Sequence, residues 1–264
     1  MAKKMNNLSG KKWLQYSFSI WRDINKSREE RRIEHPAMFP QELTTRLIKI
    51  FSKDKGEKIL DPMSGSGTTI LSAYKMGKKG IGFELSPKYV ELSQKRIKKA
   101  KKESDKKNLI KPKIYQKNIS EISKILEENS IDLVITSPPY WDILNQRRSA
   151  DRKKIKNYSD SEKDLGNIES YQEFLEKVKS GFKEVYKVLK KGKYCIVIVM
   201  DIRKKSNFYP LHIDVIKKLE EIGFELDDIV IWDRQKEYNN MKPLGFPYVF
   251  RINKVHEFIL IFKK

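Results

Sequence analysis

Two short stretches combine residue types that could do chemistry, and each follows a strand-like run of apolar residues. The first is Thr136-Ser-Pro-Pro-Tyr140, which follows the β-branched run at residues 133–135, a pattern typical of a strand buried on both faces of a parallel sheet. Because proline has no N–H and disfavours helix in the residue before it, the strand ends in a stiff, acceptor-rich loop. Such a loop suits a ligand that presents an amino group, and Tyr140 offers a ring for stacking. An ordinary strand followed by a turn is the alternative that these residues alone leave open.

The second stretch is Asp61-Pro-Met-Ser-Gly-Ser-Gly-Thr-Thr69, between a short strand and a helix that begins at about Thr68. Gly65 and Gly67 let the backbone approach a ligand at the helix N-terminus. No Gly-Lys-Ser/Thr follows, so it is not a P-loop. Glu84 comes 23 residues after Asp61, at the end of the next strand, where a nucleoside-binding βαβ unit places an acid on the ribose. A surface acid is the alternative interpretation.

Strand and helix patterns alternate along most of the chain, which predicts an α/β fold with a mostly parallel, seven-stranded sheet. The last two strands are predicted to form an antiparallel pair at the sheet edge, and Lys190-Lys-Gly-Lys193 a helix cap and turn. The strands are expected at residues 59–61, 80–84, 114–118, 133–135, 194–200, 223–232 and 257–262. The helices are expected at residues 43–51, 68–76, 89–102, 122–126, 171–189 and 211–222.

Composition bounds the class of protein. The 56 basic and 35 acidic residues give a formal charge of +21, which favours a polyanionic partner, although lysine enrichment also marks heat-adapted proteins. No apolar run approaches the roughly 20 residues of a membrane span, and the first residues lack an apolar signal core. The single cysteine, Cys195, predicts a buried thiol in a reducing compartment. We therefore expect a cytoplasmic protein, and the three scattered histidines predict no metal site.

The chain divides into a basic, aromatic arm at residues 1–34 and a single domain at residues 35–264. The arm either contacts nucleic acid or packs its tryptophans on the domain. Residues 145–170 read as a basic loop that overhangs the site and contacts DNA, with a tolerated insertion as the alternative. The candidate DNA-contacting residues are Trp141, Arg147, Arg148, Arg152, Lys153, Lys154 and Lys156.

Together the two motifs resemble those of the amino-methyltransferases of DNA, which use S-adenosylmethionine (AdoMet). His35-Pro-Ala-Met-Phe-Pro40 is similar to their cofactor-pocket segment, and Val185-Tyr-Lys-Val-Leu-Lys-Lys-Gly192 and the segment from His256 to Lys264 are similar to later signatures. The resemblance covers most of residues 35–264 and implies a Rossmann-like, AdoMet-dependent methyltransferase fold. In many relatives the Pro-Pro motif comes first, or a large recognition domain is present. Here the cofactor motif comes first and no such domain is evident.

The resemblance also implies roles for individual residues. Ser137, Pro138, Pro139 and Tyr140 would form the catalytic loop, in which the Ser137 hydroxyl and the Pro138 carbonyl hold the amine and Tyr140 stacks on the flipped base. Asp61, Gly65 and Gly67 would surround the methionine part of AdoMet, Glu84 would bind ribose, Asn118 would lie near the adenine, and His35 and Phe39 would close the pocket. The remaining cofactor-binding candidates are Met63, Ser64, Thr68, Thr69, Leu85, Ile119 and Thr136.

The serine at position 137 is the residue that bears on the target base. In this family serine usually goes with N4 of cytosine, whereas aspartate or asparagine goes with N6 of adenine. The sequence therefore favours a cytosine-N4 methyltransferase that flips its target out of double-stranded DNA, with a cognate restriction endonuclease as a partner. Adenine N6 is the main alternative. An RNA amino-methyltransferase and a catalytically inactive nucleic-acid-binding protein are further alternatives.

Overall fold

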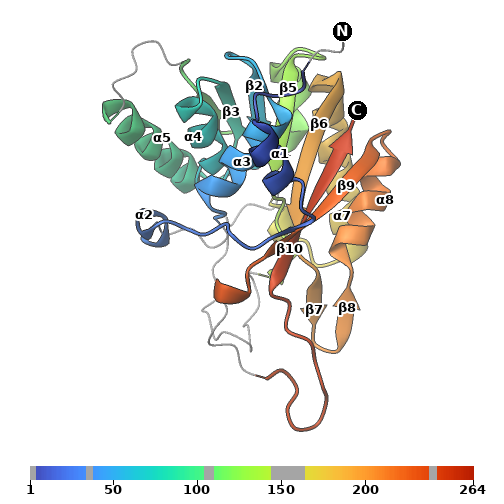
Figure 1. Cartoon of the computed structure of the whole chain (residues 1–264). Coiled ribbons are helices and arrows are strands. Elements are labelled where there is room, and N and C mark those ends of the chain that lie inside the picture. The colour runs from blue at the N-terminus through green and yellow to red at the C-terminus, as the bar shows by residue number, and fades with distance from the viewer. Residues whose placement is uncertain (1–3, 34–37, 104–109, 144–163, 238–242) are drawn as a thin grey trace.

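The computed structural model describes residues 4–33, 38–103, 110–143, 164–237 and 243–264. Helices cover both faces of a central sheet, and a smaller hairpin projects from one end of it (Figure 1). The α-helices are α1 (Gly10–Tyr16), α2 (Arg28–Arg31), α3 (Gln41–Phe51), α4 (Thr68–Lys75), α5 (Pro87–Lys102), α6 (Ile122–Ile125), α7 (Tyr171–Val188) and α8 (Leu211–Glu220). Within the described ranges no helix is long and apolar enough to cross a membrane.

The central sheet has eight strands in the order β1-β9-β10-β6-β5-β2-β3-β4. All neighbours pair in parallel except β10, which is antiparallel to both β6 and β9. The strands are β1 (Ile20–Trp21), β2 (Lys58–Asp61), β3 (Lys79–Phe83), β4 (Lys113–Tyr115), β5 (Ile131–Thr136), β6 (Leu189–Val199), β9 (Glu225–Asp233) and β10 (His256–Lys263), and β7 (Ile202–Lys204) and β8 (Asn207–Tyr209) form a separate hairpin.

The predicted α/β class, the seven predicted strands and the antiparallel pairing of the last two are confirmed. The sheet differs from the prediction in two details. β10 lies between β6 and β9, inside the sheet, and the two-residue β1 adds an eighth strand. The expected cap and turn at residues 190–193 is part of β6. Gly192 there has φ of 73°, and its N–H bonds to the Lys264 carbonyl, so neighbouring chain segments hold it in the sheet.

The N-terminal arm is joined to the domain through the edge of the sheet. β1 pairs with the end of β9, and Trp21 is buried. Arg46 of α3, itself buried, donates to both carboxylate oxygens of Asp23 at 2.9 and 2.8 Å and lies 4.9 Å from the Trp21 ring. Trp13 of α1 is half exposed. The arm therefore packs one of its two tryptophans.

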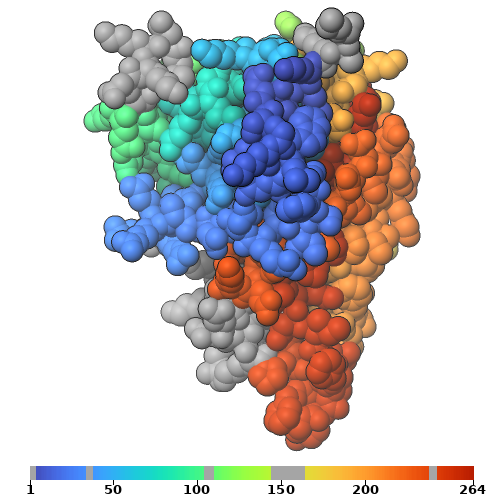
Figure 2. Space-filling model, in the orientation of Figure 1, coloured from blue at the N-terminus to red at the C-terminus, as the bar shows by residue number. Residues whose placement is uncertain are grey.

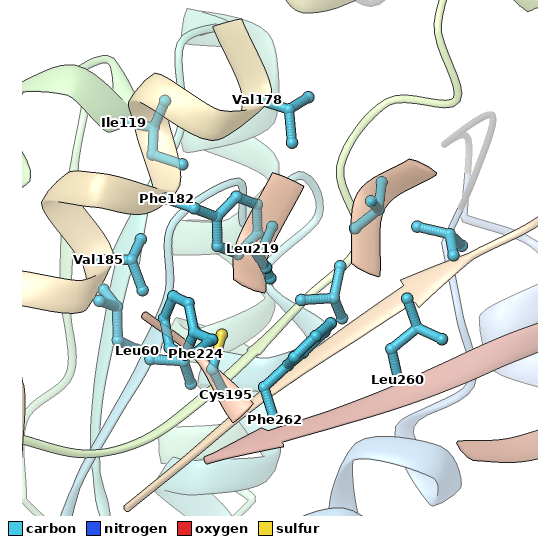
Figure 3. Close-up of a cluster of buried hydrophobic side chains, with 14 of the residues drawn as sticks. Leu60, Ile119, Val178, Phe182, Val185, Cys195, Leu219, Phe224, Leu260 and Phe262 are labelled. Carbon is cyan, nitrogen blue, oxygen red and sulfur yellow. The ribbon is translucent and has the colours of Figure 1, made fainter. Parts of the chain in front are cut away.

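Alternating residues of the central strands supply two hydrophobic cores, one on each face of the sheet. Leu60 and Val134 belong to the core that α7 and α8 cover, whereas Ile59 and Leu133 face the core under α3. Figure 3 shows side chains of the first core, among them Phe182 and Val185 of α7 and Cys195 of β6. Cys195 is fully buried, as predicted, and burial raises the pKa of its thiol. Two-sided burial explains why these strands are continuously apolar.

The turn between β2 and α4 depends on a glycine at position 67. Gly67 is the N-cap of α4 in the left-handed conformation, with φ of 74°. A Cβ added there would lie 2.7 Å from Ser93 Oγ and 2.8 Å from Ser93 Cβ. Only glycine satisfies both the dihedral angle and the close approach of α5.

We predict that Gly67→Ala destabilises the protein more than Gly77→Ala, which lies at the other end of α4. Both glycines have positive φ, but the nearest atom to a Cβ at position 77 is 4.0 Å away. Both variants should therefore lose about 1–2 kcal/mol from backbone strain, and Gly67→Ala should lose about 1–3 kcal/mol more from overpacking. Urea denaturation measures the difference. Equal losses in the two variants would contradict the packing of Gly67 against Ser93.

Candidate active site

A pocket lies at the point where the order of the sheet reverses. β3 and β4 follow β2 on one side, whereas β5 lies on the other. Ligands of open α/β sheets bind at such switch points, beyond the carboxyl ends of the strands. The pocket has an empty volume of about 890 Å³, its open mouth included, and is lined by the segments that follow β2, β3, β4 and β5. The two motifs of the sequence are thus brought to one cavity.

The turn that follows β2 is held by both of its neighbours. Ser64 N–H donates to the Phe83 carbonyl at the end of β3, at 2.8 Å. From α5, Ser93 Oγ donates to the Gly65 carbonyl at 2.8 Å, and Arg96 donates to the Ser66 carbonyl at 2.6 Å. The glycine turn is therefore preformed. Ser64 Oγ is buried beside the pocket and has no hydrogen-bond partner among the described residues.

Two carboxylates, the buried Asp61 and the partly buried Glu84, lie beside this turn. Glu84 accepts hydrogen bonds from the N–H groups of Gly65 at 2.7 Å and Ser86 at 2.8 Å. Burial raises the pKa of Glu84 to about 7, and the nearby Asp61 charge adds to the shift, although the two N–H groups oppose it. Burial likewise raises the pKa of Asp61 to about 6, although the hydroxyls of Thr69 and Thr136 act to lower it. Because no described cation pairs with either group, the site favours a positively charged ligand.

The loop that follows β5 carries a directed chain of hydrogen bonds. Ser137 Oγ donates to Tyr140 Oη at 3.1 Å, and Tyr140 Oη donates to Glu257 Oε2 at 2.8 Å. Glu257 is buried and pairs with the guanidinium of Arg234. Burial, and next the Glu257 charge, raise the pKa of Tyr140 well above its usual range, so its proton stays on the phenol. The proton of the Ser137 hydroxyl is therefore used in the hydrogen bond to Tyr140. The lone pairs of Ser137 Oγ remain available to accept hydrogen bonds.

Most of the predicted cofactor and catalytic residues meet in this cavity. Those that line it are Phe39, Met63, Ser64, Gly65, Thr68, Glu84, Leu85, Asn118, Ile119, Ser137, Pro138, Pro139 and Tyr140. Four predicted residues do not line the pocket themselves but belong to strands and turns that carry lining residues: Asp61, Gly67, Thr69 and Thr136. The predicted residues that lie outside the described part of the chain are His35, Arg147, Arg148, Arg152, Lys153, Lys154 and Lys156.

The structure also adds residues to the pocket that the motifs did not single out. These are Met38, Pro62, Ser66, Phe83, Lys117, Asp164 and Leu165. Asp164 is the most informative, because it is a third acid beside the pocket, it is buried, and burial raises its pKa. It falls within the predicted basic loop at residues 145–170, and no local pattern marks it. Met38 and Pro62, in contrast, adjoin predicted residues.

Trp141 does not have the exposed position expected of a DNA contact. Its side chain is only 4% exposed, and Nε1 donates to the Ile168 carbonyl at 2.8 Å. The ring packs against Tyr171 and Tyr209, with centroids 5.1 and 5.0 Å away. Trp141 therefore packs in the core next to the loop at residues 137–140, and the prediction of direct DNA contact is corrected. The local sequence does not distinguish a tryptophan that faces solvent from one that is buried in the core.

Comparison with known proteins gives the family. The chain belongs to the N6/N4 DNA methylase family, whose profile matches residues 1–95 and 131–264. A Type II methyltransferase of Methanothermobacter thermautotrophicus, M.MthZI, is 32% identical over 167 residues, which cover 58% of this chain and 44% of that protein. The matches to the first four curated relatives span from 8% to 65% of those proteins' lengths.

Solved structures show the same fold at low identity. TrmN from Thermus thermophilus aligns with a TM-score of 0.54 and 13% identity over 87% of this chain and 50% of that one. A SAM-dependent O-methyltransferase from Thermotoga maritima aligns with a TM-score of 0.51 and 13% identity over 89% of this chain and 69% of that one. The fold is therefore that of the AdoMet-dependent methyltransferases, as the motif resemblance implied.

AdoMet is the cofactor that goes with this family and fold, and the residues present fit it. AdoMet carries positive charge on its sulfonium and ammonium groups, which complements the unpaired carboxylates of Asp61 and Glu84. The unpartnered Ser64 hydroxyl offers a further polar contact. In the described part of the chain no cluster of three or more His, Cys, Asp or Glu side chains could hold a metal ion.

We predict that AdoMet binds more tightly as pH rises. A cationic ligand favours ionised Glu84, which in the free protein has a pKa of about 7, so binding releases a proton below that pH. The affinity should increase about tenfold between pH 6 and pH 8 and level off above it. Calorimetric titration at a series of pH values measures this change. Glu84→Gln, which cannot ionise, should flatten the profile, and an equally steep profile in that variant would contradict the assignment.

Proposed function

We propose that the protein transfers a methyl group from AdoMet to an exocyclic amine of a base in double-stranded DNA. The observation that carries the proposal is the hydrogen-bond direction at Ser137. Since Ser137 donates to Tyr140, and Pro138 and Pro139 have no N–H, the loop presents acceptors to the pocket. Acceptors match the N–H groups of an amine and reject a carbonyl oxygen, which would leave polar groups unpaired. Membership of the DNA methylase family supports DNA as the substrate.

The chain's own residues would act by positioning and electrostatics. The amine of a base is a poor nucleophile because its lone pair is delocalised into the ring. Hydrogen bonds from the amine to Ser137 Oγ and the Pro138 carbonyl would draw electron density toward the nitrogen and orient it. When bound, AdoMet supplies an electrophilic methyl group. The base has to leave the duplex stack to reach the pocket, and the Tyr140 ring would stack on it there.

We propose N4 of cytosine as the target atom. The support is the serine at position 137, which in proteins that share this motif usually accompanies cytosine. Adenine N6 remains the alternative. We also propose that Glu84 binds the ribose of AdoMet, that Asn118 lies near its adenine, and that the basic loop at residues 145–170 contacts DNA. Type II relatives such as M.MthZI support a restriction-modification system, with a restriction endonuclease as the functional partner.

The test is to identify the methylated nucleoside. The protein is incubated with methyl-labelled AdoMet and duplex DNA, and the DNA is digested and analysed by mass spectrometry. N4-methylcytosine is the expected product. N6-methyladenine would retain amine methylation but overturn the choice of base. If duplex DNA receives no label, the proposed function is wrong, and labelled RNA in a parallel reaction would identify RNA as the substrate instead.

Two alanine variants should separate catalysis from cofactor binding. Ser137→Ala removes one acceptor from the amine, so kcat should fall by about 10²-fold while the AdoMet Kd stays near the wild-type value. Glu84→Ala should do the reverse, raising the AdoMet Kd about tenfold or more through loss of a charged hydrogen-bond acceptor, with a smaller effect on kcat at saturating AdoMet. Calorimetry and steady-state kinetics measure both. A Ser137→Ala variant that loses AdoMet affinity without losing kcat would reverse the assigned roles.

A further inference from the structure

A projection at the carboxyl end of the sheet has no role in the pocket and is unusual in composition. It consists of the β7–β8 hairpin and residues 243–254, and we call it the aromatic finger. β7 begins three residues after the end of β6, and residues 243–254 end two residues before the start of β10. The finger therefore projects from the carboxyl end of the sheet, which is also the end at which the pocket opens. Figure 1 shows it extending beyond the sheet, and in Figure 2 residues 243–254 form the tapered lower tip.

The tip of the finger exposes large apolar side chains. Tyr248 and Phe250 are each 91% exposed, Phe246 is 77% exposed and Ile252 is 63% exposed. A tight turn presents them, because the N–H groups of Tyr248 and Val249 both donate to the Gly245 carbonyl, at 2.8 and 2.7 Å. An exposed apolar group of this kind marks an interaction surface.

The charge of the finger indicates which partner covers this surface. Its two segments contain no Asp or Glu but five cations, Arg203, Lys204, Lys205, Arg251 and Lys254. Lys254 Nζ and the Arg203 guanidinium lie 4.7 and 5.4 Å from the Phe208 ring, so the two segments are joined. Lys204 is paired with Asp142, but the finger still has a net positive charge, which repels a second copy of itself and attracts a polyanion. Aromatic and apolar side chains among cations are the groups that enter a DNA groove and wedge between base steps.

The finger is also attached to the catalytic loop. Lys204 of β7 forms an ion pair with Asp142 at 2.6 Å, and its Nζ lies 4.0 Å from the Trp141 ring. Tyr209 of β8 packs against the same ring, with centroids 5.0 Å apart. Trp141 directly follows Tyr140, so the hairpin is connected to the residues that line the pocket. A duplex that placed a base in the pocket would pass beside the finger.

We propose that the aromatic finger is a DNA-contacting element that inserts its tip into a groove beside the target base and contributes to recognition of the sequence. The proposal rests on the proposed function for the identity of the site but on separate residues for the contact. Tyr248 and Phe250 supply the inserted surface. Arg251 and Lys254 contact phosphates.

The first experiment compares Tyr248→Ser/Phe250→Ser with wild type and with Leu14→Ser as a control. Leu14 is 62% exposed on α1, toward the other end of the sheet. Methylation mapping of treated genomic DNA gives the recognition sequence, and fluorescence anisotropy measures Kd for a duplex with that sequence and for a scrambled duplex. The double variant should lose about tenfold or more of the preference for the target duplex, with AdoMet affinity unchanged. Leu14→Ser should lose none.

The second experiment measures the salt dependence of binding. Arg251→Gln/Lys254→Gln should reduce the slope of log Kobs against log salt by about 2, because each substitution leaves one phosphate without its cation. The aromatic variant should keep the wild-type slope, because its side chains release no counterions. An unchanged slope in Arg251→Gln/Lys254→Gln would overturn the assignment of these residues to phosphates.

The outcomes distinguish the finger from the proposed function. If wild type methylates DNA and the aromatic variant retains full target preference, the finger proposal is wrong and the proposed function stands. A second outcome is that wild type binds duplex DNA but transfers no methyl group. In that case the proposed function is wrong, and loss of binding to the scrambled duplex in Arg251→Gln/Lys254→Gln would support the finger proposal independently. Absence of DNA binding by wild type, or tip-dependent binding to vesicles of anionic phospholipid in place of DNA, overturns the finger proposal.

Discussion

The buried carboxylate of Glu257 determines the polarity of the candidate active site. Glu257 pairs with Arg234 and accepts a hydrogen bond from Tyr140 Oη. Tyr140 Oη then accepts from Ser137, and the Ser137 hydroxyl faces the pocket with its lone pairs. A residue more than one hundred positions away in sequence thereby makes the loop an acceptor of N–H groups. This constraint links the last strand of the sheet to the amine substrate that we propose.

The same edge of the sheet supplies the complementary part of the site. Asp61 ends β2 and Glu84 directly follows the end of the neighbouring parallel strand β3, so their charges are brought together in a site partly shielded from water. Such a pair is unfavourable without a cation. Because Glu84 and Ser137 line the same pocket, this arrangement matches a cofactor that brings positive charge to the amine that we propose as substrate. The two acids and the acceptor-rich loop therefore complement each other, and neither alone would indicate a methyltransferase.

Much of this was predictable from sequence because the responsible patterns are local. The strands are continuous apolar runs, the glycine turn follows β2 directly, and Glu84 follows Asp61 at a βαβ spacing. Long-range contacts were hidden. Glu257 reads as an ordinary residue at the start of the last strand, and its partners Tyr140 and Arg234 are distant in sequence. β1 is two residues long and forms through Trp21 and the Arg46–Asp23 pair. The burial of Trp141 depends on Tyr171 and Tyr209, which no local pattern connects to it.

The most direct measurement of the hydrogen-bond direction is single-turnover methyl transfer by Tyr140→Phe. The substitution keeps the ring and removes only the hydroxyl, so stacking is retained while the Ser137 proton is freed to rotate toward the pocket. The account predicts methyl transfer about tenfold slower or more, the equivalent of roughly 1–2 kcal/mol for one misdirected hydrogen bond. The AdoMet Kd should not change. Transfer at the wild-type rate would contradict the claim that Glu257 and Tyr140 fix Ser137 as an acceptor.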